Sequence, residues 1–393
     1  MSNPEVNVAI FDTTPRDGAQ SLPKANQFPD GSKADISNAV AELGVGVIEA
    51  GFPKTPFDAE EVADVARTVG ATGYDVVEWV DGEISGSRER PPVIAGLCRV
   101  VPGDIEIGWS SVQAADRPRI HTFVSTDDYH RENRFPGINR DDLVEMARKG
   151  VAFAVATSAG HPGASVEFSA EAASTTEMAY LERVVKTALD EGADIVNVPD
   201  TVGQRDPVGM FDYYTAVIDW VMETNPTATI SAHNHNDLGM AVANTVTFVQ
   251  AAAAWASQHG QSVNTQLETT VCGLGERAGN ADVFPSVASL FKFAPNMQVP
   301  IRWQFNPWKS VEVATAVMGF AGLQVDRQNP VVGSDIMRHR SGIHSHGVLK
   351  GGHKMYTPFA PTFWGHPEDA VHEEGKYQGV AGTAAARAKA LIP

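Results

Sequence analysis

Short apolar runs recur along the chain and alternate with segments in which apolar residues repeat every three or four positions. Eight of these runs are nearly continuous in apolar residues, as expected for parallel strands that are covered on both faces. They span Val8–Thr14, Val45–Phe52, Pro92–Cys98, Ile120–Thr126, Val166–Ser169, Asp194–Pro199, Thr229–His233 and Val263–Thr270. The pattern therefore predicts eight buried strands of one parallel sheet.

The segments between the predicted strands have the spacing of amphipathic helices. One of them runs from Ile36 to Leu43 and is followed by Gly44, where a helix C-cap belongs. Ser174 and Glu177 have the spacing of a capping box at the start of another helix. The Ala-rich stretch Ala241–Ser257 predicts a long helix before the last strand.

Eight strands that alternate with helices predict an α/β protein, a (β/α)8 TIM barrel over residues 1–300. A doubly wound open sheet is the alternative, and the evenness of the repeat favours the barrel. The polar segment Glu78–Pro91 predicts a surface loop before the third strand. In residues 301–393 the periodicity fades, and aromatic residues occur among many Gly, Pro and His residues. Because exposed aromatic patches are costly, we expect this loop-rich C-terminal extension to pack as a lid or an interface arm.

The composition narrows the function classes. The 393 residues are 43% hydrophobic and 20% charged, which is typical of a globular protein. A net charge of -18 argues against nucleic acid or an anionic membrane as the main partner. Cys98 and Cys272 are the only cysteines and predict no disulfide framework. The N-terminal sequence does not resemble a signal peptide, and no window is apolar enough to span a membrane, so we expect a cytoplasmic protein.

Polar residues follow the carboxyl ends of several predicted strands, where TIM barrels build their active sites. His233 and His235 lie two apart on a strand, so both imidazoles point to the same face and can reach one ion. Asp17, after the first strand, is the natural carboxylate partner. Two His and one carboxylate leave open positions for a chelating substrate and suit Mg²⁺, Mn²⁺ or Zn²⁺. Structural histidines, and an Asp17 that only pairs with Arg16, are the alternative.

Further polar groups follow other strands. Arg16 is a permanent cation that can bind a carboxylate or stabilise an oxyanion. Glu171 is either an acid–base or supporting group or a surface carboxylate at a helix start. The segment GLGERAGN (Gly273–Asn280) suits a close backbone approach to a phosphate-bearing cofactor, and a tight turn closed by Glu276 and Arg277 is the alternative.

Four ordered motifs resemble one enzyme family. They are DTTPRDGAQ (Asp12–Gln20), HNHNDLG (His233–Gly239), GLGERAGN (Gly273–Asn280) and SGIH (Ser341–His344). Together they resemble the metal-dependent Claisen-condensing family that includes 2-isopropylmalate synthase, homocitrate synthase and citramalate synthase. The resemblance runs from Asp12 to about Ala385.

Within this family, the segments GLCR, HTFVST, VEFSAE, NVPDTVG and NPVVGS are most similar to 2-isopropylmalate synthase. The resemblance implies a 2-oxo acid pocket formed by His121, Ser169, Asn197, Pro199 and Thr201. Homocitrate synthases tend to carry Ala where this chain has Pro199. An apolar pocket favours 2-oxoisovalerate over an acid with a second carboxylate.

The resemblance implies an acyltransferase that condenses acetyl-CoA with a 2-oxo acid and hydrolyses the thioester to release CoA. A divalent metal would orient the 2-oxo acid, and Arg16 would help to stabilise the developing alkoxide. Gly273, Gly275, Glu276 and Arg277 would contact acetyl-CoA. His344 and, after a shift of one residue, Tyr356 match acid–base groups that cover the neighbouring subunit's site. We therefore expect a homodimer. Glu171 is a further catalytic candidate.

Several positions depart from the family pattern. Pro15 and Ala19 replace the usual Leu and Glu, and Ser345 and His346 follow the SGIH motif. Cys272 occupies the position at which the resemblance implies an Asn that completes the metal shell. Cys272 is therefore either a metal ligand that favours Zn²⁺ or a buried thiol without a ligand role. The sequence ends before the family's regulatory domain, so leucine feedback is not expected. The alternatives are a homocitrate, citramalate or phosphonomethylmalate synthase, a CoA-ester lyase, an aldolase and a non-catalytic barrel.

Overall fold

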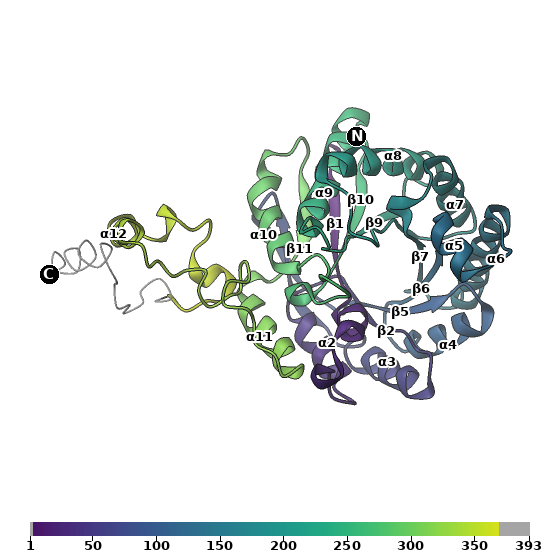
Figure 1. Cartoon of the computed structure of the whole chain (residues 1–393), viewed down its shortest axis with the longest axis horizontal. Helices are drawn as coiled ribbons and strands as arrows, with labels where there is room; N and C mark the ends of the chain where they lie inside the picture. Colours follow the sequence, from purple (N-terminus) through teal and green to yellow (C-terminus); the bar gives the residue numbers. More distant parts are fainter. Residues whose placement is uncertain (1–2, 369–393) are drawn as a thin grey trace.

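The computed structural model describes residues 3–368, and its centre is a closed barrel of parallel strands (Figure 1). Each strand pairs with the next one in parallel, and the last pairs with the first, from Val6 opposite Val263 to Asp12 opposite Thr269. The barrel strands are β1 (Val6–Asp12), β2 (Val47–Gly51), β5 (Val93–Arg99), β6 (Pro118–Ser125), β7 (Ser165–Glu171), β8 (Ile195–Asn197), β9 (Thr229–His233) and β10 (Val263–Thr269). All eight predicted strands are present, and the closure confirms the TIM barrel.

Helices surround the barrel and cover the outer face of its strands (Figure 1). They are α2 (Lys33–Ala41), α3 (Pro56–Thr68), α4 (Pro102–Val112), α6 (Arg140–Ser158), α7 (Met178–Asp190), α8 (Pro207–Thr224), α9 (Ala241–His259) and α10 (Val283–Phe293). Short helices α1 (Ala19–Ser21) and α5 (Asp128–Arg134) follow β1 and β6. Gly44, at φ +73°, lies in the left-handed turn after α2, because a residue without Cβ adopts this conformation freely. No helix in the described part of the chain combines the length and apolarity that a membrane crossing requires.

The capping box predicted for α7 is wrong. Glu177 itself is the N-cap, and its carboxylate accepts hydrogen bonds from the backbone N–H groups of Ala179 and Tyr180. The Ser174 hydroxyl instead donates to Asp200 Oδ1 at 2.6 Å, in the loop after β8. A buried carboxylate from the neighbouring strand end therefore competes successfully for this hydroxyl.

The surface loop predicted for Glu78–Pro91 is also wrong, because this segment belongs to a β-hairpin. Strands β3 (Tyr74–Val80) and β4 (Glu83–Arg90) pair antiparallel through a two-residue turn at Asp81 and Gly82. Both turn residues have positive φ, 50° and 85°, as a type I′ turn requires. Asp-Gly is a strong sequence signal for this turn, and the surrounding polar residues obscured it.

The start of the C-terminal extension is part of the barrel structure. Strand β11 (Ile301–Gln304) pairs with the beginning of β1 and with β3, so β11 and the hairpin extend the sheet at the amino-terminal end of the barrel. Helix α11 (Ser310–Phe320) packs on α2. Trp303, Phe305 and Trp364 are buried, as expected for aromatic residues that pack on the barrel.

The rest of the extension projects away from the barrel. Helix α12 (Gly342–Gly351) lies at its far end, well separated from the strands (Figure 1). Ile343, Met355 and Tyr356 are exposed on this projecting part. We call residues 336–358 the arm. After the arm the chain packs on the barrel again, where Trp364 contacts Phe291 of α10.

Candidate active site

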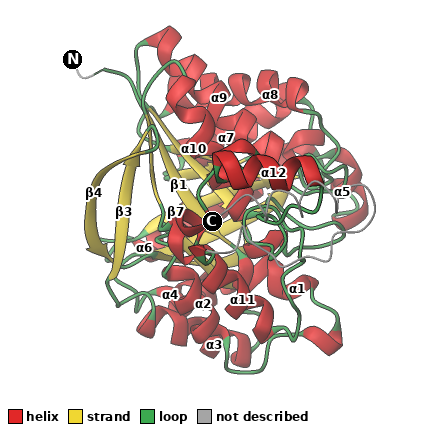
Figure 2. Ribbon diagram, turned by 90° about the vertical axis from the view of Figure 1, so that its left-hand side faces the viewer, coloured by secondary structure: helices red, strands yellow, loops and turns green. Residues whose placement is uncertain are grey.

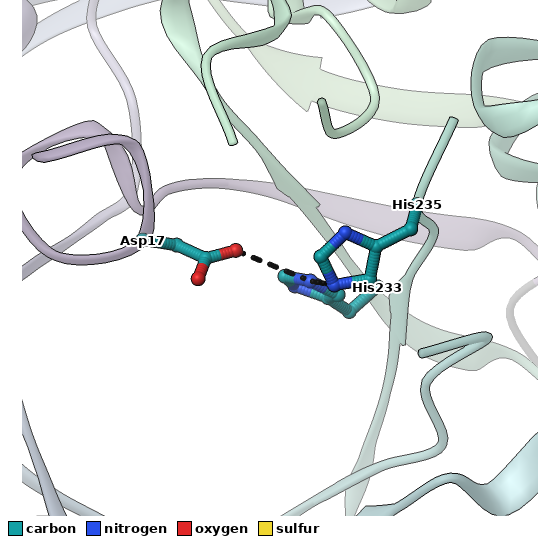
Figure 3. A group of neighbouring side chains, drawn as sticks. All are labelled: Asp17, His233 and His235. Atoms are coloured by element: carbon teal, nitrogen blue, oxygen red, sulfur yellow. Dashed lines mark hydrogen bonds and ion pairs between the residues drawn. The ribbon is translucent and has the colours of Figure 1, made fainter. Parts of the chain in front are cut away.

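Three side chains from two strand ends converge at the carboxyl end of the barrel (Figure 3). One ligand atom each of Asp17, His233 and His235 lies within 4.8 Å of the others. The Nε2 atoms of the two histidines are 3.2 Å apart, and Asp17 Oδ2 is 3.6 Å from His233 Nε2. All three residues are buried. The sequence prediction that these residues lie together is confirmed.

The hydrogen bonds of these residues suit a cation. His233 Nδ1 lies 2.9 Å from Glu268 Oε2, so a proton on Nδ1 leaves the lone pair of Nε2 directed at the other two residues. Burial and the charge of His233 lower the pKa of His235 to about 3, which keeps its imidazole neutral. Burial acts to raise the pKa of Asp17, but the charges of Arg16 and His233 hold it below its usual value. A cation that displaces the second proton of His233 would meet two imidazole nitrogens and a carboxylate, which are a donor set for a divalent transition metal.

Asn280, which the sequence reading did not single out as a metal-site residue, belongs to this cluster. Its Nδ2 donates to Asp17 Oδ2 at 2.7 Å, and its backbone forms a β-bridge with His235. Its Oδ1 is buried and has no hydrogen-bond partner among the described residues. An amide oxygen is a hard donor, and a bound cation would supply the partner that this atom lacks in the protein.

The structure does not bring Cys272 into the cluster. Cys272 is absent from the group of mutually close ligand atoms and packs against the hydrophobic core. Burial, together with the charge of Asp282, raises the pKa of its thiol, and a thiol binds a metal well only as the thiolate. The position fits the alternative of a partly buried thiol without a ligand role, and Asn280 rather than Cys272 contacts the cluster.

Arg16 is held beside the cluster by two carboxylates. Its Nε lies 2.6 Å from Glu49 Oε2, and its Nη1 lies 2.8 Å from Asp17 Oδ1. Glu49, at the buried centre of β2, also accepts a hydrogen bond from the Thr13 hydroxyl. Burial acts to raise the pKa of Glu49, but Arg16 and His121 outweigh it and lower the pKa. The guanidinium is therefore fixed in one orientation.

His121 links Glu49 to the predicted 2-oxo acid pocket. Its Nδ1 lies 2.7 Å from Glu49 Oε1, and its Nε2 lies 2.6 Å from the Ser169 hydroxyl. Asn197 Nδ2 donates to the same hydroxyl at 2.9 Å, while Asn197 Oδ1 is buried without a partner among the described residues. Burial lowers the pKa of His121, but the charges of Glu167 and Glu49 raise it to about 9.

One cavity of about 750 Å³ joins these groups at the mouth of the barrel. Of the residues predicted from the sequence, it is lined by Arg16, Asp17, His121, Ser169, Glu171, Asn197, Pro199, Thr201, His233, His235, Glu276 and Arg277. Its wall also contains a set of apolar side chains, namely Phe52, Leu97, Val100, Val101, Phe123, Val124, Phe135 and Met146. A polar floor and an apolar wall are typical of a pocket for a small amphiphilic ligand.

Glu171 lies at the edge of this cavity, where it is held in an ion pair. Arg134 Nη1 lies 2.6 Å from Glu171 Oε2, and the Ser125 hydroxyl donates to the same oxygen. The carboxylate is half-buried, so it is accessible from the cavity. Because the Glu171 side chain lines a cavity, it differs from the surface carboxylate that was the alternative interpretation of this residue.

The glycine-rich loop after β10 curves around Asn280. Gly273 has a φ of +69°, and a Cβ on Gly275 would lie 2.7 Å from the Asn280 side chain. Arg277 closes the loop through Asp237, at 2.8 Å, and through the Thr201 carbonyl, at 2.7 Å. The loop thus contains a turn with a network, although Arg277 pairs with Asp237 rather than with Glu276.

His344 and Tyr356 are not part of this cavity within the described chain. They lie on the arm, where their rings stack with centroids 4.0 Å apart. The arm projects away from the barrel mouth (Figure 1), so the structure of a single chain does not bring these two residues to the other candidates.

Buried charges inside the barrel hold the candidate site residues, and these charges were not identified from the sequence. Glu268 orients His233, and Glu49 orients Arg16 and His121. Below them, Glu167 pairs with Arg119 at 3.0 Å and accepts a hydrogen bond from Gln266 at 2.8 Å. An available signal was a charged residue within an otherwise buried strand, as in VIEAG of β2.

Comparisons with known proteins agree with this geometry. The model of the HMGL-like family matches residues 7–299. A 2-isopropylmalate synthase of Rhodopirellula baltica is 37% identical over 87% of this chain and 57% of its own length. A probable 2-isopropylmalate synthase of Methanopyrus kandleri is 36% identical over 95% of this chain and 64% of its own length. The chain thus spans less than two thirds of these relatives.

Solved structures share the fold at lower identity. The HMG-CoA lyase from Brucella melitensis superimposes with a TM-score of 0.56 at 16% identity, over 80% of this chain and 98% of the lyase. The hydroxymethylglutaryl-CoA lyase from Pseudomonas aeruginosa gives a TM-score of 0.53 at 17% identity, over 81% of this chain and 93% of that chain. Since the family model covers most of the sequence and the barrel agrees, the chain belongs to the HMGL-like family.

Proposed function

We propose that this chain is an acyltransferase that condenses acetyl-CoA with a 2-oxo acid, 2-oxoisovalerate being favoured. The acetyl methyl group loses a proton, its carbon forms a bond to the keto carbon, and water cleaves the thioester to give a 2-alkylmalate and CoA. The observation that carries the proposal is the convergence of Asp17, His233 and His235 with Arg16 beside an apolar pocket. The names of the similar synthases support it.

A divalent cation is the implied cofactor, with Mg²⁺, Mn²⁺ and Zn²⁺ as candidates. The residues that would hold it are Asp17, His233 and His235, and Asn280 Oδ1 is the further donor. When bound, the cation would supply Lewis-acid polarisation of the 2-oxo acid. Cys272 is not included, for the reasons of burial and protonation given above.

Arg16 stabilises negative charge that develops on the former keto oxygen. Its guanidinium keeps a fixed position because Asp17 and Glu49 hold two of its nitrogens. A preorganised cation in a buried site costs no reorganisation as charge builds up during the reaction. This arrangement supports a role in the transition state as well as in substrate binding.

The 2-oxo acid is oriented by the polar floor of the cavity. Ser169 and Asn197 offer hydrogen-bonding atoms there, and Asn197 Oδ1 lacks a protein partner. Pro199 and Thr201, which follow β8, also line this part of the cavity. Leu97, Phe135 and Met146 then favour an alkyl tail, because a second carboxylate would lose its hydration against apolar atoms.

The remaining candidate residues lie in two regions, at Glu171 and in the loop after β10. Glu171 lines the cavity beside Arg134, where it is placed to position a substrate or move a proton. Gly273, Gly275, Glu276 and Arg277 are proposed to contact acetyl-CoA at the loop after β10. The proposed setting is the cytoplasm, which is compatible with two free cysteines.

The proposed assembly is a homodimer in which the arm of one chain supplies His344 and Tyr356 to the neighbouring site. The exposure of Ile343, Met355 and Tyr356 on a projecting segment supports an arm that another chain covers. Co-expression of two inactive variants, Asp17→Asn and His344→Ala, tests this arrangement. If arms are exchanged, each mixed dimer has one intact site of two, and a random population, about half of which is mixed dimers, recovers about a quarter of wild-type activity. If each arm serves its own barrel, the mixture stays inactive.

The reaction is tested by measuring thiol release from acetyl-CoA with a panel of 2-oxo acids. CoA release that is strongest with 2-oxoisovalerate and is lost with a chelator supports the proposal. Stronger release with 2-oxoglutarate, pyruvate or phosphonopyruvate would keep the chemistry and change the substrate. Cleavage of hydroxymethylglutaryl-CoA without any condensation would instead favour a lyase, like the two lyases that share this fold.

A further inference from the structure

A second cavity lies at the opposite end of the barrel from the candidate active site. It has a volume of about 440 Å³ and is lined by the first residues of β1, β9 and β10 together with the β3–β4 hairpin and β11. Figure 2 shows β3 and β4 on the side of the barrel where the chain's N-terminus lies. Active sites of TIM barrels lie at the other end, so the proposed condensation leaves this cavity without a role.

The lining of this cavity is strongly basic, although the whole chain has a net charge of -18. Five arginines line it, namely Arg88, Arg90, Arg117, Arg119 and Arg302. Glu78 is the single acidic residue among the described residues of the lining. We call this second cavity the basic cavity. Such a local excess of cations in an acidic protein favours small anions over other ligands.

Three of the five arginines already have carboxylate partners. Arg88 pairs with Glu78 at 2.8 Å, and Arg302 pairs with Glu5 at 2.5 Å. Arg119 is buried and pairs with Glu167 at 3.0 Å in the network inside the barrel. These three side chains therefore contribute to the structure of this end of the barrel.

Arg90 and Arg117 differ from the other three. Neither forms an ion pair with any residue of the described chain, and Arg117 donates only a long hydrogen bond, 3.4 Å, to the Pro91 carbonyl. Both side chains are half-buried. Burial and the charges of Arg90 and Arg119 lower the pKa of Arg117 to about 10. Burial and Arg88 also lower the pKa of Arg90, and the charge of Glu78 offsets this only in part. Two neighbouring, partly desolvated cations without a direct ion-pair partner destabilise the fold unless an anion compensates them.

Trp303 is a further residue in the wall of this cavity. Its indole Nε1 is buried and has no partner among the described residues. The volume is within the range of sites for small molecules.

We propose that the basic cavity binds a small dianion with phosphate or carboxylate groups, held mainly by Arg90 and Arg117. Guanidinium groups bind such oxyanions through paired N–H donors, which suits the two guanidinium groups that lack an ion-pair partner. Because this site lies at the amino-terminal end of the barrel, the ligand stabilises the fold without contacting the reacting atoms. The proposal does not depend on the identity of the 2-oxo acid.

The test measures binding to the full chain by titration calorimetry and thermal unfolding. Inorganic phosphate and succinate are the probes, and sodium chloride at the same ionic strength is the control. We expect one of the two probes to bind and to raise the Tm of the wild type and of Arg67→Gln, an exposed arginine outside the cavity. The Arg90→Gln/Arg117→Gln variant should bind the same probe at least about tenfold more weakly. Whether phosphate or succinate binds more tightly identifies the chemical class of the ligand.

Two further measurements keep the proposal falsifiable. In a buffer without dianions, the double variant should be at least as stable as the wild type, because two repelling cations have been removed. The Arg16→Gln variant should bind the probe like the wild type, because Arg16 lies at the opposite end of the barrel. Equal binding by the wild type and the double variant would overturn the proposal. So would binding that disappears with Arg16→Gln, since the probe would then occupy the active site.

Discussion

The two ends of the barrel differ in whether the arginines that line their cavities all have carboxylate partners. At the carboxyl end, Arg16, Arg134 and Arg277 each pair with a carboxylate. At the amino end, Arg90 and Arg117 have no carboxylate partner among the described residues. Paired charges fix side chains in one geometry, as catalysis requires, whereas unpaired cations are suited to a ligand that brings the missing charge.

A hydrogen-bonded network connects these two ends through the barrel interior. Arg119 donates to Gln266 at 2.7 Å, Gln266 donates to the Ser231 hydroxyl at 3.0 Å, and that hydroxyl donates to Glu268 at 3.0 Å. Glu268 then holds His233. From the difference in ion pairing between the two ends, we predict that substitutions near the carboxyl end change activity most. Substitutions at the amino end should change mainly stability.

The largest effect is expected for the proposed metal ligands. Asp17→Asn or His233→Ala removes a donor from the cluster and should lower turnover on the order of 1000-fold, because polarisation of the substrate is lost. Metal content after dialysis and CoA release together measure this effect. His259→Ala, which changes an exposed histidine, is the matched control. Normal turnover in a metal-depleted Asp17→Asn variant would contradict the assignment.

Glu49→Gln should impair both activity and stability. Arg16 and His121 would each lose a buried carboxylate partner, which is expected to cost about 3–5 kcal/mol of unfolding free energy. Turnover should fall about 10–100-fold, because the orientation of Arg16 is relaxed. Urea unfolding and initial rates measure the two effects. Glu61→Gln, whose partner Lys33 is 3.5 Å away near the surface, should cost less than about 1 kcal/mol.

Trp79→Ala should affect stability without affecting chemistry. Trp79 is buried in the hairpin, contacts Phe291 with ring centroids 4.7 Å apart, and donates to the Phe305 carbonyl at 2.8 Å. Its removal is expected to cost about 3–5 kcal/mol, with kcat unchanged at a temperature where the variant is folded. Trp79→Phe, which keeps a ring, should cost only about 1–3 kcal/mol. A large fall in kcat for the Phe variant would show that the two ends are not separable.

His121 should give the smallest effect, as a pH dependence of stability. Burial opposes its charge, but Glu167 and Glu49 raise its pKa to about 9 in the folded chain. Because the folded pKa exceeds the unfolded value of about 6.5, the stabilisation is complete below that value and is lost as pH rises through about 9. Wild type should thus lose on the order of 2–3 kcal/mol more than His121→Gln between pH 7 and pH 10. Parallel curves for the two proteins would contradict a charged His121.

The fold was predictable because local patterns and tertiary structure agree in the barrel. Continuous apolar runs identified all eight strands, since strands covered on both faces contain few polar residues. The hairpin was missed because β4 is largely exposed and polar, and only Asp81-Gly82 signalled the turn. The capping box failed because Asp200, distant in sequence, binds Ser174 more effectively than the local N–H groups do.

The candidate site was predictable only in part. Asp17, His233 and His235 follow strand ends, so the geometry of a barrel brings them together. Asn280 was overlooked because the turn of the glycine-rich loop decides whether Cys272 or Asn280 faces the cluster, and sequence spacing does not. Glu49 and Glu268 lie within strands, away from the strand ends on which the prediction relied. His344 and Tyr356 remain a prediction that requires a second chain.

The most direct test of the account measures CoA release from acetyl-CoA and 2-oxoisovalerate by the full chain, before and after chelation and after metal is restored. The account predicts release that disappears with the chelator, returns with Mg²⁺, Mn²⁺ or Zn²⁺, and is absent in Asp17→Asn. CoA release that is unchanged after complete removal of metal, or that persists in Asp17→Asn, would contradict the central role of the Asp17, His233 and His235 cluster.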